Sequence, residues 1–395
     1  MRMLIAGAGI GGLAAALHLH AAGLSPELVE AARRCEPLGV GINLLPAAVD
    51  ELVRLGLGDE LASLGVPVAE MAHFDRHGNL IWREPREGQY SIHRGELQMM
   101  LLRAVQDRLG ADAVRFGCSV EDFTAGPLTV LCRERDSGRE VTLSADVLVG
   151  ADGLHSAVRR RLHPGEGEPL TNGIMMWRGI SRGRPLRTGP TVAVYGCNAR
   201  AKLVVYPISR PDGGLVQLNW VAEARGPVRA PGRSQDDVRA DLAACFESWS
   251  LPGLDVAALF AAAPEVLELP MTDRDPLATW GSGPVTLLGD AAHPMFPIGS
   301  NGASQAILDA RALATALSRA GDPEEGLRAY EAERLPLANG VVAACRAMPA
   351  DRILSLVADR APDGFSDVTG VLTADELATV SAAYRHTSHS AAATG

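Results

Sequence analysis

The sequence predicts an α/β fold in which a parallel, helix-covered sheet carries a second, antiparallel sheet. Three observations support this prediction. Several short apolar runs end in glycine or aspartate and are followed by a helical pattern, as in βα units. The region from 173 to about 280 instead alternates strand-like runs with loops. A chain of 395 residues is also too long for one ordinary compact domain, so two domains are expected.

The first elements form a predicted nucleotide-binding unit. A strand over Met1–Ala6 leads into a glycine-rich turn and a helix to about residue 22, and a second strand over 26–29 ends at Glu30. This is G-x-G-x-x-G with an acidic residue about twenty positions later, which is typical of a Rossmann-like dinucleotide site. Glu30 would bond the ribose, and an ordinary glycine turn is the alternative. The glycines that would approach a pyrophosphate are Gly7, Gly9, Gly11 and Gly12.

The next stretch offers weaker signals. The loop Leu38–Ile42, with Val40 and Gly41, would let backbone lie against a flat ligand, although a plain loop explains the spacing equally well. A helix is predicted over 46–55 and a hairpin over 68–83.

Arg94 lies near the start of a predicted helix over 96–109. A cation at that end is unfavourable unless an anionic group is close, which makes Arg94 a candidate cofactor contact. A surface arginine is the alternative.

A second carboxylate closes a strand further along the chain. Meander strands are predicted over 115–132 and 141–143, and a buried strand then ends at Asp152-Gly153. A helix opens after Ser156. This arrangement suits a ligand contact or a simple N-terminal cap, since Asp and Ser are ordinary there.

The most informative stretch starts with the buried strand Val285–Leu288, which ends at Gly289-Asp290. Prolines and glycines then prevent regular structure until a helix begins after Ser300-Asn301. A carboxylate and a helix amino terminus would thus point at the place where open α/β sheets bind ligands. A polyol chain and a ring that becomes anionic, as in reduced flavin, would use both. A capped helix without a ligand is the alternative.

The middle region predicts a sheet that forms one wall of a substrate pocket. Strands are expected over 174–179, 191–195, 202–207 and 215–221, followed by a helix over 236–249. Large side chains gather here in a chain that is only 4% aromatic, and the core of the sheet is their alternative location. The candidate substrate contacts are Met175, Trp177, Tyr206 and Trp220.

The end of the chain is predicted to be helical. Helical patterns continue over 323–334 and 337–347, and Thr373–Glu376 is a capping box for a helix to about residue 384. The small, polar stretch 385–395 is expected to be disordered.

Composition excludes some classes of function. A net charge of -10 without a long basic run argues against nucleic-acid binding. The six cysteines lack paired short spacing, so we expect reduced thiols in a cytoplasmic protein and no metal site. Glycines interrupt the apolar amino terminus, which disfavours a signal peptide, and no membrane span is expected.

Three motifs together carry a resemblance. Gly7–Gly12 with Glu30, Asp152-Gly153 and Gly289-Asp290 resemble, in order and spacing, the group A flavin monooxygenases, the para-hydroxybenzoate hydroxylase-like family. Further stretches are similar to phenazine monooxygenases that act on 5-methylphenazine-1-carboxylate. These stretches are 37–43, 90–99, 176–179, 273–277 and 301–309.

The resemblance implies the para-hydroxybenzoate hydroxylase fold, a Rossmann-like FAD-binding domain with an inserted antiparallel-sheet substrate domain. A C-terminal helical segment, 346–384, would follow. The FAD-binding domain would comprise residues 1–66, 90–170 and 275–345, and the substrate-binding domain 67–89 and 171–274.

The resemblance also implies FAD as cofactor and NADH or NADPH as electron donor. Asp290 would bind the ribityl chain, and Asp152-Gly153 would serve both FAD and the donor. Ala31 stands where an arginine often follows the ribose-binding acid, so the adenine contacts stay open. The implied cofactor-binding residues are Gly7, Gly9, Gly11, Gly12, Glu30, Val40, Gly41, Arg94, Gln98, Val120, Asp152, Gly153, Gly289, Asp290, Ser300, Asn301 and Gly302.

The implied reaction is hydroxylation of a cyclic or polycyclic aromatic substrate through a flavin C4a-hydroperoxide, with no protein nucleophile or base. His293 is expected to anchor its loop, and Met295 to contact the substrate. If the substrate carries a carboxylate, Arg178 or Lys202 could hold it and CO2 could be lost. The residues expected to crowd the flavin face are Pro294, Phe296, Pro297 and Gly299.

Other readings stay open on the sequence. FAD could instead support epoxidation, Baeyer–Villiger insertion or dehydrogenation, or the protein could be a non-catalytic flavin-binding redox sensor. Secondary metabolism is the expected setting, and the expected partners are a small aromatic substrate, O2 and NAD(P)H. The enzyme is expected to be a monomer or homodimer without a nucleic acid or membrane partner.

Overall fold

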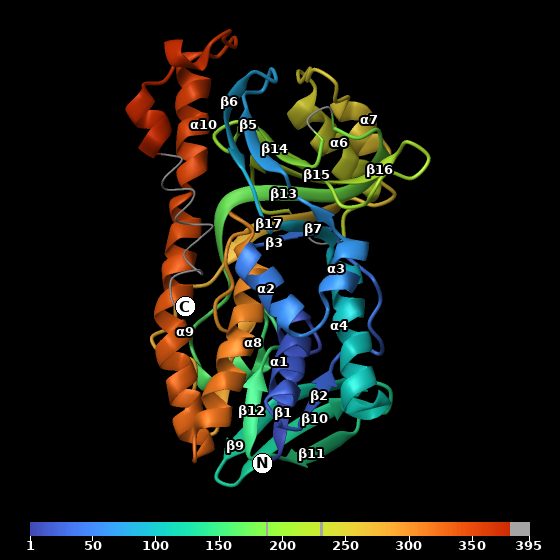
Figure 1. The fold of residues 1–395 in the computed structure, drawn as a ribbon, viewed down its shortest axis with the longest axis vertical. Coiled ribbons are helices and arrows are strands. Elements are labelled where there is room, and N and C mark those ends of the chain that lie inside the picture. The colour runs from blue at the N-terminus through green and yellow to red at the C-terminus, as the bar shows by residue number, and fades with distance from the viewer. Residues whose placement is uncertain (187–188, 230–231, 380–395) are drawn as a thin grey trace.

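The computed structural model describes residues 1–186, 189–229 and 232–379. A parallel sheet with its helices occupies one end of the molecule in Figure 1, and a larger sheet occupies the other. The helices packed on the parallel sheet include α1 (Ile10–Ala21), α4 (Arg94–Leu109) and α8 (Asn301–Arg319). The long helix α9 (Pro323–Ala347) runs beside them and leads into α10 (Pro349–Arg360), which reaches the larger sheet (Figure 1).

The parallel sheet has five strands in the order β18-β12-β1-β2-β8. Its strands are β1 (Met3–Ala6), β2 (Pro26–Glu30), β8 (Val114–Phe116), β12 (Val147–Gly150) and β18 (Val285–Leu287). Ala6 lies opposite Gly150, and Gly150 lies opposite Leu287. Because the carboxyl ends of parallel strands share one edge, the three predicted strand-end motifs lie side by side there.

The larger sheet has seven strands in the order β17-β13-β16-β15-β14-β5-β6. The predicted hairpin, β5 and β6, joins its edge, and β14 pairs with β5 in parallel, so the sheet is not wholly antiparallel. Its strands are β5 (Glu70–Phe74), β6 (Leu80–Pro85), β13 (Leu170–Gly183), β14 (Thr191–Cys197), β15 (Ala201–Pro207), β16 (Val216–Arg225) and β17 (Leu267–Asp273).

Strand register separates the side chains of this sheet into two faces. Arg178 of β13 lies opposite Val221 of β16, whereas its neighbour Trp177 lies opposite Ala222. Since successive side chains in a strand point to opposite faces, Arg178 and Trp177 cannot face the same side. The face with Trp177 packs on helices α6 (Gln235–Phe246) and α7 (Val256–Ala261) in a continuous core.

Smaller elements complete the fold. The predicted meander is present as a three-stranded sheet, and a second three-stranded sheet lies beside the glycine loop at 38–42. These elements are β3 (Gly41–Leu44), β4 (Val66–Pro67), β7 (Tyr90–His93), β9 (Cys118–Ala125), β10 (Leu128–Glu134), β11 (Glu140–Ser144), α2 (Pro46–Arg54), α3 (Gly58–Leu64) and α5 (Ala157–Leu162).

The C-terminal helices differ from the sequence prediction. α9 is one helix that continues through Pro336, because packing against α8 outweighs the backbone hydrogen bond that proline lacks. The capping box is confirmed: the Thr373 N–H donates to Glu376 Oε2 at 2.8 Å, and the Glu376 N–H donates to Thr373 Oγ1 at 3.2 Å. Its helix covers 374–379, and the predictions for 380–395 lie outside the described residues.

Within the described chain, no helix combines the length and the apolar composition that crossing a bilayer requires.

Candidate functional site

A cavity of about 370 Å³ lies between the carboxyl edge of the parallel sheet and one face of the larger sheet. One half is lined mostly by backbone and small residues, and the other by side chains of the larger sheet and α10. The glycines that line the first half are Gly9, Gly11, Gly41, Gly153, Gly289, Gly299 and Gly302. The second half includes Met71, His73, Arg178, Val192, Val194, Lys202, Val204, Tyr206, Val221, Glu223 and Asp351.

The glycines of the first turn have different roles. Gly7 has a φ of +102°, and a Cβ there would lie 2.4 Å from the Ala151 carbonyl oxygen, so Gly7 shapes the turn. Gly9 has ordinary extended backbone, and a Cβ there would meet no protein atom within 4 Å. The space beside Gly9 belongs to the cavity, which leaves room for a ligand against the start of α1.

Glu30 and Gln98 support this turn from outside the cavity lining. Glu30 accepts hydrogen bonds from the N–H groups of Ala8 and Ala32, each at 2.7 Å. Gln98 of α4 donates to the Ala8 carbonyl oxygen at 2.8 Å. Both side chains therefore lie beside the turn where a dinucleotide would pass, and their contacts with a cofactor stay predictions.

Other predicted contacts lie further from the cavity. Val40 is 6% exposed and its carbonyl accepts the Arg94 N–H at 2.9 Å, while the Arg94 side chain itself lines the cavity. Val120 is a buried residue of β9 in the core beneath the parallel sheet. Gly12 packs against the Gly7 backbone inside the turn.

The two strand-end aspartates differ. Asp152 accepts hydrogen bonds from the Ser156 hydroxyl and from the Ala157 N–H at 2.8 Å, so it caps α5, and its neighbour Gly153 lines the cavity. Asp290 is exposed, because its carboxylate opens into the cavity, and it makes no hydrogen bond to the described residues. Desolvation by the surrounding cavity walls raises the pKa of Asp290, with smaller effects from neighbouring charges.

The loop before α8 bends sharply towards the cavity. Ser300 has a left-handed backbone with φ of 62°, which is uncommon for a residue other than glycine. Asn301 donates from Nδ2 to the Ile298 and Gly299 carbonyl oxygens, each at 3.3 Å, whereas its buried Oδ1 has no partner within the described chain. The first turn of α8, including Gly302, faces the cavity.

Only some of the loop residues that were predicted to lie against the ligand line the cavity. Met295, Pro297 and Gly299 line the cavity. Pro294 and Phe296 are buried in the protein interior instead, and Phe296 packs in a core cluster with Met176 and Met271. The alternation of inward and outward positions along the loop explains the difference.

His293 anchors this loop and does not face the cavity. Its Nε2 lies 2.5 Å from Asp309 Oδ2, and Arg334 Nε donates to Asp309 Oδ1 at 2.7 Å. Burial tends to raise the pKa of Asp309, but His293 and Arg334 outweigh it and lower the pKa to about 2. Asp309 also accepts the Gly289 N–H at 3.1 Å, which ties the loop to α8.

The groups on this side fit FAD. The open side of Gly9 suits a pyrophosphate beside the amino end of α1, and the free Asp290 carboxylate suits ribityl hydroxyls. The first turn of α8, at Gly302, places backbone N–H groups and the positive end of a helix dipole where a ring with developing negative charge would lie.

The opposite side takes its character from one face of the larger sheet. Of the predicted substrate contacts on strands, Tyr206 faces the cavity, while Met175, Trp177 and Trp220 lie on the other face in the core. Trp177 donates to Glu268 Oε1 at 3.0 Å, and Trp220 donates to the Ser181 hydroxyl at 2.9 Å. Strand register, which short sequence patterns do not fix, explains this placement.

Two cations on this face have different surroundings. Lys202 is paired with Glu223, at 2.8 Å, and with Asp351, at 3.1 Å. Arg178 has no ion pair within the described chain; Nη2 donates to the Gly41 carbonyl oxygen at 3.3 Å, and the buried Nε has no partner. Burial is the main cause that lowers the pKa of Arg178.

Sequence reasoning missed Glu223, Asp351 and His73. Glu223 and His73 lie at alternate positions of strands, so only the register could have placed them. Asp351 lies in α10, whose helix was not predicted as a wall of the site.

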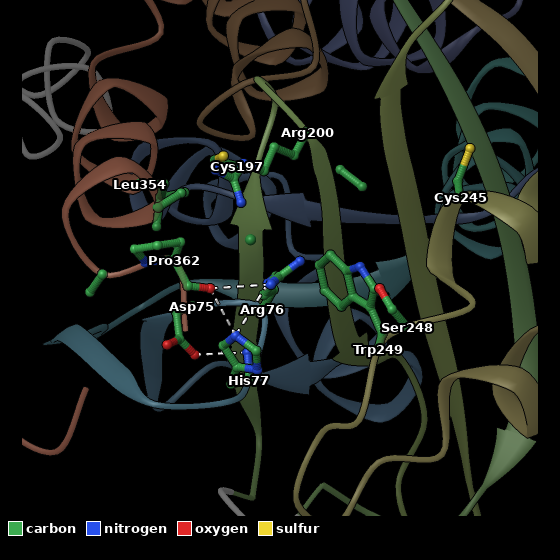
Figure 2. A pocket seen from close by; sticks show the side chains of 14 residues that line it. Asp75, Arg76, His77, Cys197, Arg200, Cys245, Ser248, Trp249, Leu354 and Pro362 are labelled. Carbon is green, nitrogen blue, oxygen red and sulfur yellow. Dashed lines mark hydrogen bonds between the residues drawn. The ribbon is translucent and has the colours of Figure 1, made fainter. Parts of the chain in front are cut away.

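A second cavity, of about 190 Å³, lies on the far side of α10 (Figure 2). Arg76 Nη2 donates to the Pro362 carbonyl oxygen at 3.2 Å, and the His77 N–H donates to Asp75 Oδ1 at 2.8 Å. The second contact shapes the β5–β6 turn, and the first ties that turn to the chain after α10. Leu354 lines both cavities, so α10 forms a partition between them.

Known proteins share this architecture. The FAD binding domain family matches residues 1–345. The chain is 45% identical over 367 residues to phenazine 1,6-dicarboxylic acid hydroxylase of Lysobacter antibioticus, covering 87% of this chain and 89% of the relative. It is 32% identical to 3-hydroxybenzoate 6-hydroxylase 1 of Aquipseudomonas alcaligenes, covering 84% of each chain.

A solved structure agrees with the fold. HpxO of Klebsiella pneumoniae, complexed with FAD and uric acid, has a TM-score of 0.74 and 26% identity, covering 98% of this chain and 93% of that one. The predicted resemblance, fold class and cofactor are thereby confirmed. The chain belongs to the FAD binding domain family, and it is a flavin-dependent aromatic monooxygenase.

Proposed function

We propose that this enzyme hydroxylates a flat polycyclic heteroaromatic substrate that carries a carboxylate, and that Arg178 binds this carboxylate. The unpaired state of Arg178 carries the proposal. A partly buried charge without an ion pair is unfavourable, and the guanidinium presents paired donors that match a carboxylate. Lys202, the other candidate cation, already has two carboxylates beside it.

The remaining walls suit a planar ring. Val192, Val194, Val204 and Val221 form an apolar surface on the sheet, and Tyr206 adds a polar edge beside Arg178. Among the relatives, one is named for a phenazine dicarboxylic acid and another for hydroxybenzoate, and both compounds are aromatic carboxylates.

The cofactor contacts are part of this proposal. Gly9 and Gly11 approach the pyrophosphate, Glu30 bonds the ribose, Asp290 bonds the ribityl chain, and Arg94 contacts the FAD beside the Gly39–Gly41 loop. The support is their common position along the cavity and the turn that leads away from it. The donor site for NADH or NADPH near Gly153 rests on the resemblance alone.

FAD, reduced by NADH or NADPH, supplies the oxygen-activating chemistry when it is bound. The chain supplies orientation and shielding. The α8 amino terminus stabilises negative charge on the ring, and the apolar side chains of Met295 and Ile298 limit the access of water. Arg178 fixes the edge of the substrate that faces the cofactor. When the hydroxylated carbon carries the carboxylate, that group leaves as CO2.

The cellular setting is also proposed. We place the enzyme in the cytoplasm and in secondary metabolism, acting as a monomer or homodimer with no nucleic acid or membrane partner. The free thiols of all six cysteines support the cytoplasmic location.

The test compares Arg178→Met with Arg182→Met. Arg182 lies four residues along the same strand, in an exposed pair with Asp212, and serves as the matched control. We expect R178M to weaken binding of an aromatic carboxylate by about tenfold to a hundredfold, because a charge-assisted pair contributes roughly 1.5–3 kcal/mol. A neutral analogue should bind both variants equally.

The measurement is titration of the FAD-loaded enzyme, followed by analysis of products under turnover with NADH and NADPH. Equal losses for the acid and its neutral analogue would contradict the role of Arg178. Consumption of the electron donor that never yields hydroxylated product from any aromatic acid would contradict the proposed function and favour a dehydrogenase.

A further inference from the structure

The far end of the cavity holds a buried cluster of three charged groups. Lys202 Nζ lies 2.8 Å from Glu223 Oε2 and 3.1 and 3.3 Å from the Asp351 carboxylate oxygens. The three side chains are 5–10% exposed, and all three residues line the cavity. They come from β15, β16 and α10, so two separate parts of the chain meet here.

This cluster leaves no positive charge for an incoming anion. Two carboxylates face one ammonium group, and a proton on Glu223, whose pKa burial raises, would still leave Lys202 neutralised by Asp351. His73, on β5 two strands away from β15, adds no charge near neutral pH, because burial, with Lys202 and Arg86, lowers its pKa to about 3.

Arg178 lies on the same face of the larger sheet as the three charged groups, but next to the Gly41 carbonyl, at the end of the cavity away from α10. The cavity thus has two cations without an ion pair in the described chain, Arg94 and Arg178, towards the glycine-lined half, and a neutral or negative cluster towards α10. A flat ligand that spans the two would meet opposite electrostatic conditions at its two ends.

Resting on the proposed function, we propose that Glu223 and Asp351 determine specificity by neutralising Lys202, so that the site accepts an aromatic ring with one carboxylate and rejects a ring with a second carboxylate at the opposite end. The favoured group at that end is neutral, or a donor of hydrogen bonds to Asp351 or Glu223. Rejection follows because a second anion would be desolvated beside carboxylates without a free cation.

A purely structural role explains the cluster less well. Buried ion pairs add little net stability, because desolvation offsets their attraction. α10 is already held against the sheet by apolar packing of Ile353, Leu354 and Val357 with Ile81 and Val194. The charged groups therefore have their main effect on what the cavity admits.

The experiment uses FAD-loaded enzyme and three ligands that share one ring system and carry no, one or two carboxylates: phenazine, phenazine-1-carboxylate and phenazine-1,6-dicarboxylate. Binding is read from the ligand-induced change in FAD absorbance, which needs no turnover. The variants are the double change E223Q with D351N and the triple change that adds K202M. Asp359→Asn, at an exposed position of the same helix, is the matched control.

We expect the wild-type enzyme and D359N to bind the dicarboxylate at least about tenfold more weakly than the monocarboxylate. In the double variant, Lys202 is released as a free cation, and the dicarboxylate should gain about tenfold or more, while phenazine is unchanged. The triple variant should lose this gain. That loss separates a charge effect from an enlarged or loosened cavity.

The proposal is overturned if the double variant leaves the ratio of dicarboxylate to monocarboxylate affinity unchanged, or if the wild-type enzyme prefers the dicarboxylate. Failure of the proposed function gives a different result. In that case phenazine-1-carboxylate binds wild-type enzyme no better than phenazine, and a gain in the double variant that is larger for the dicarboxylate than for the monocarboxylate would still support the charge-neutralising role of Glu223 and Asp351.

Discussion

The two halves of the cavity are built in different ways. The half that fits FAD is made largely of backbone: glycines, strand ends and the first turn of α8. The half that faces the substrate is made of side chains from one face of the larger sheet and from α10. A backbone site depends on local sequence, because glycine positions and turn geometry lie within a few residues of each other. A side-chain site depends on how distant strands pair.

This difference predicts that changes on the two sides have separable effects. A change in the glycine-lined half should remove FAD, and a change on the sheet face towards the cavity should mainly alter ligand binding or its dependence on charge. A change on the opposite face of the same sheet should alter stability alone. Four measurements test this separation, from the largest expected effect to the smallest.

Trp220→Ala should lower the free energy of unfolding by about 3–5 kcal/mol, because the side chain is fully buried between the sheet and Phe260. Val204→Ala, on the cavity face of β15, should cost less stability but weaken ligand binding. Chemical denaturation and ligand titration measure both quantities. A fall in ligand affinity for folded W220A would contradict the placement of Trp220 on the face of the sheet that points away from the cavity.

Gly9→Val should weaken FAD binding by about a hundredfold, roughly 3 kcal/mol, without unfolding the apoprotein. Its backbone suits any residue, and the added side chain would project into the cavity. Gly226→Val, where a Cβ also meets no protein atom within 4 Å, is the control. Retention of FAD through purification by G9V would contradict the proposed path of the cofactor.

Asp290→Asn should reduce FAD affinity by about tenfold, because an amide is a weaker acceptor for ribityl hydroxyls than a carboxylate. Asp152→Asn should mainly loosen the start of α5, since Asp152 caps that helix. Fluorescence of released FAD during dialysis measures the first effect, and thermal unfolding of the apoprotein the second. Equal loss of FAD in both variants would argue against separate roles.

Acid pH should destabilise the substrate half through His73. Its folded pKa, about 3, is below the value of about 6.5 expected when unfolded, so the unfolded chain binds the extra proton. The stability contributed by neutral His73 is complete above pH 6.5 and is lost as the pH falls towards 3. His73→Phe keeps a ring against Trp82 and should flatten the pH dependence by at most about 1.4 kcal/mol per pH unit. An unchanged slope between pH 6 and 4 would contradict this.

The sequence was informative about the half of the cavity that fits FAD, because a site built from backbone depends on residues that lie close together in the chain. The strand-end motifs at Gly7–Gly12 and at Gly289-Asp290 could be placed because a strand, a turn and a helix follow within a short segment. The same local logic gave an N-terminal cap as the alternative at Asp152–Ser156, and Ser156 is indeed the N-cap residue of α5.

The substrate half could not be predicted in the same way. Trp177 and Arg178 are adjacent in sequence, yet one is in the core and the other faces the cavity. Residue type favoured tryptophan as a ligand contact, and only the pairing of β13 with β16 decides against it. The pairing of Lys202 with Asp351, 149 positions apart, left no local signal.

The position of Asp351 also has a consequence for where ligand choice can be changed. The glycine turns and the start of α8 come from the stretch 1–302, whereas the helix that carries Asp351 begins only at residue 349. With the proposed role of Asp351, a change confined to α10 is expected to alter which aromatic acids bind while the hold on the cofactor stays as it is.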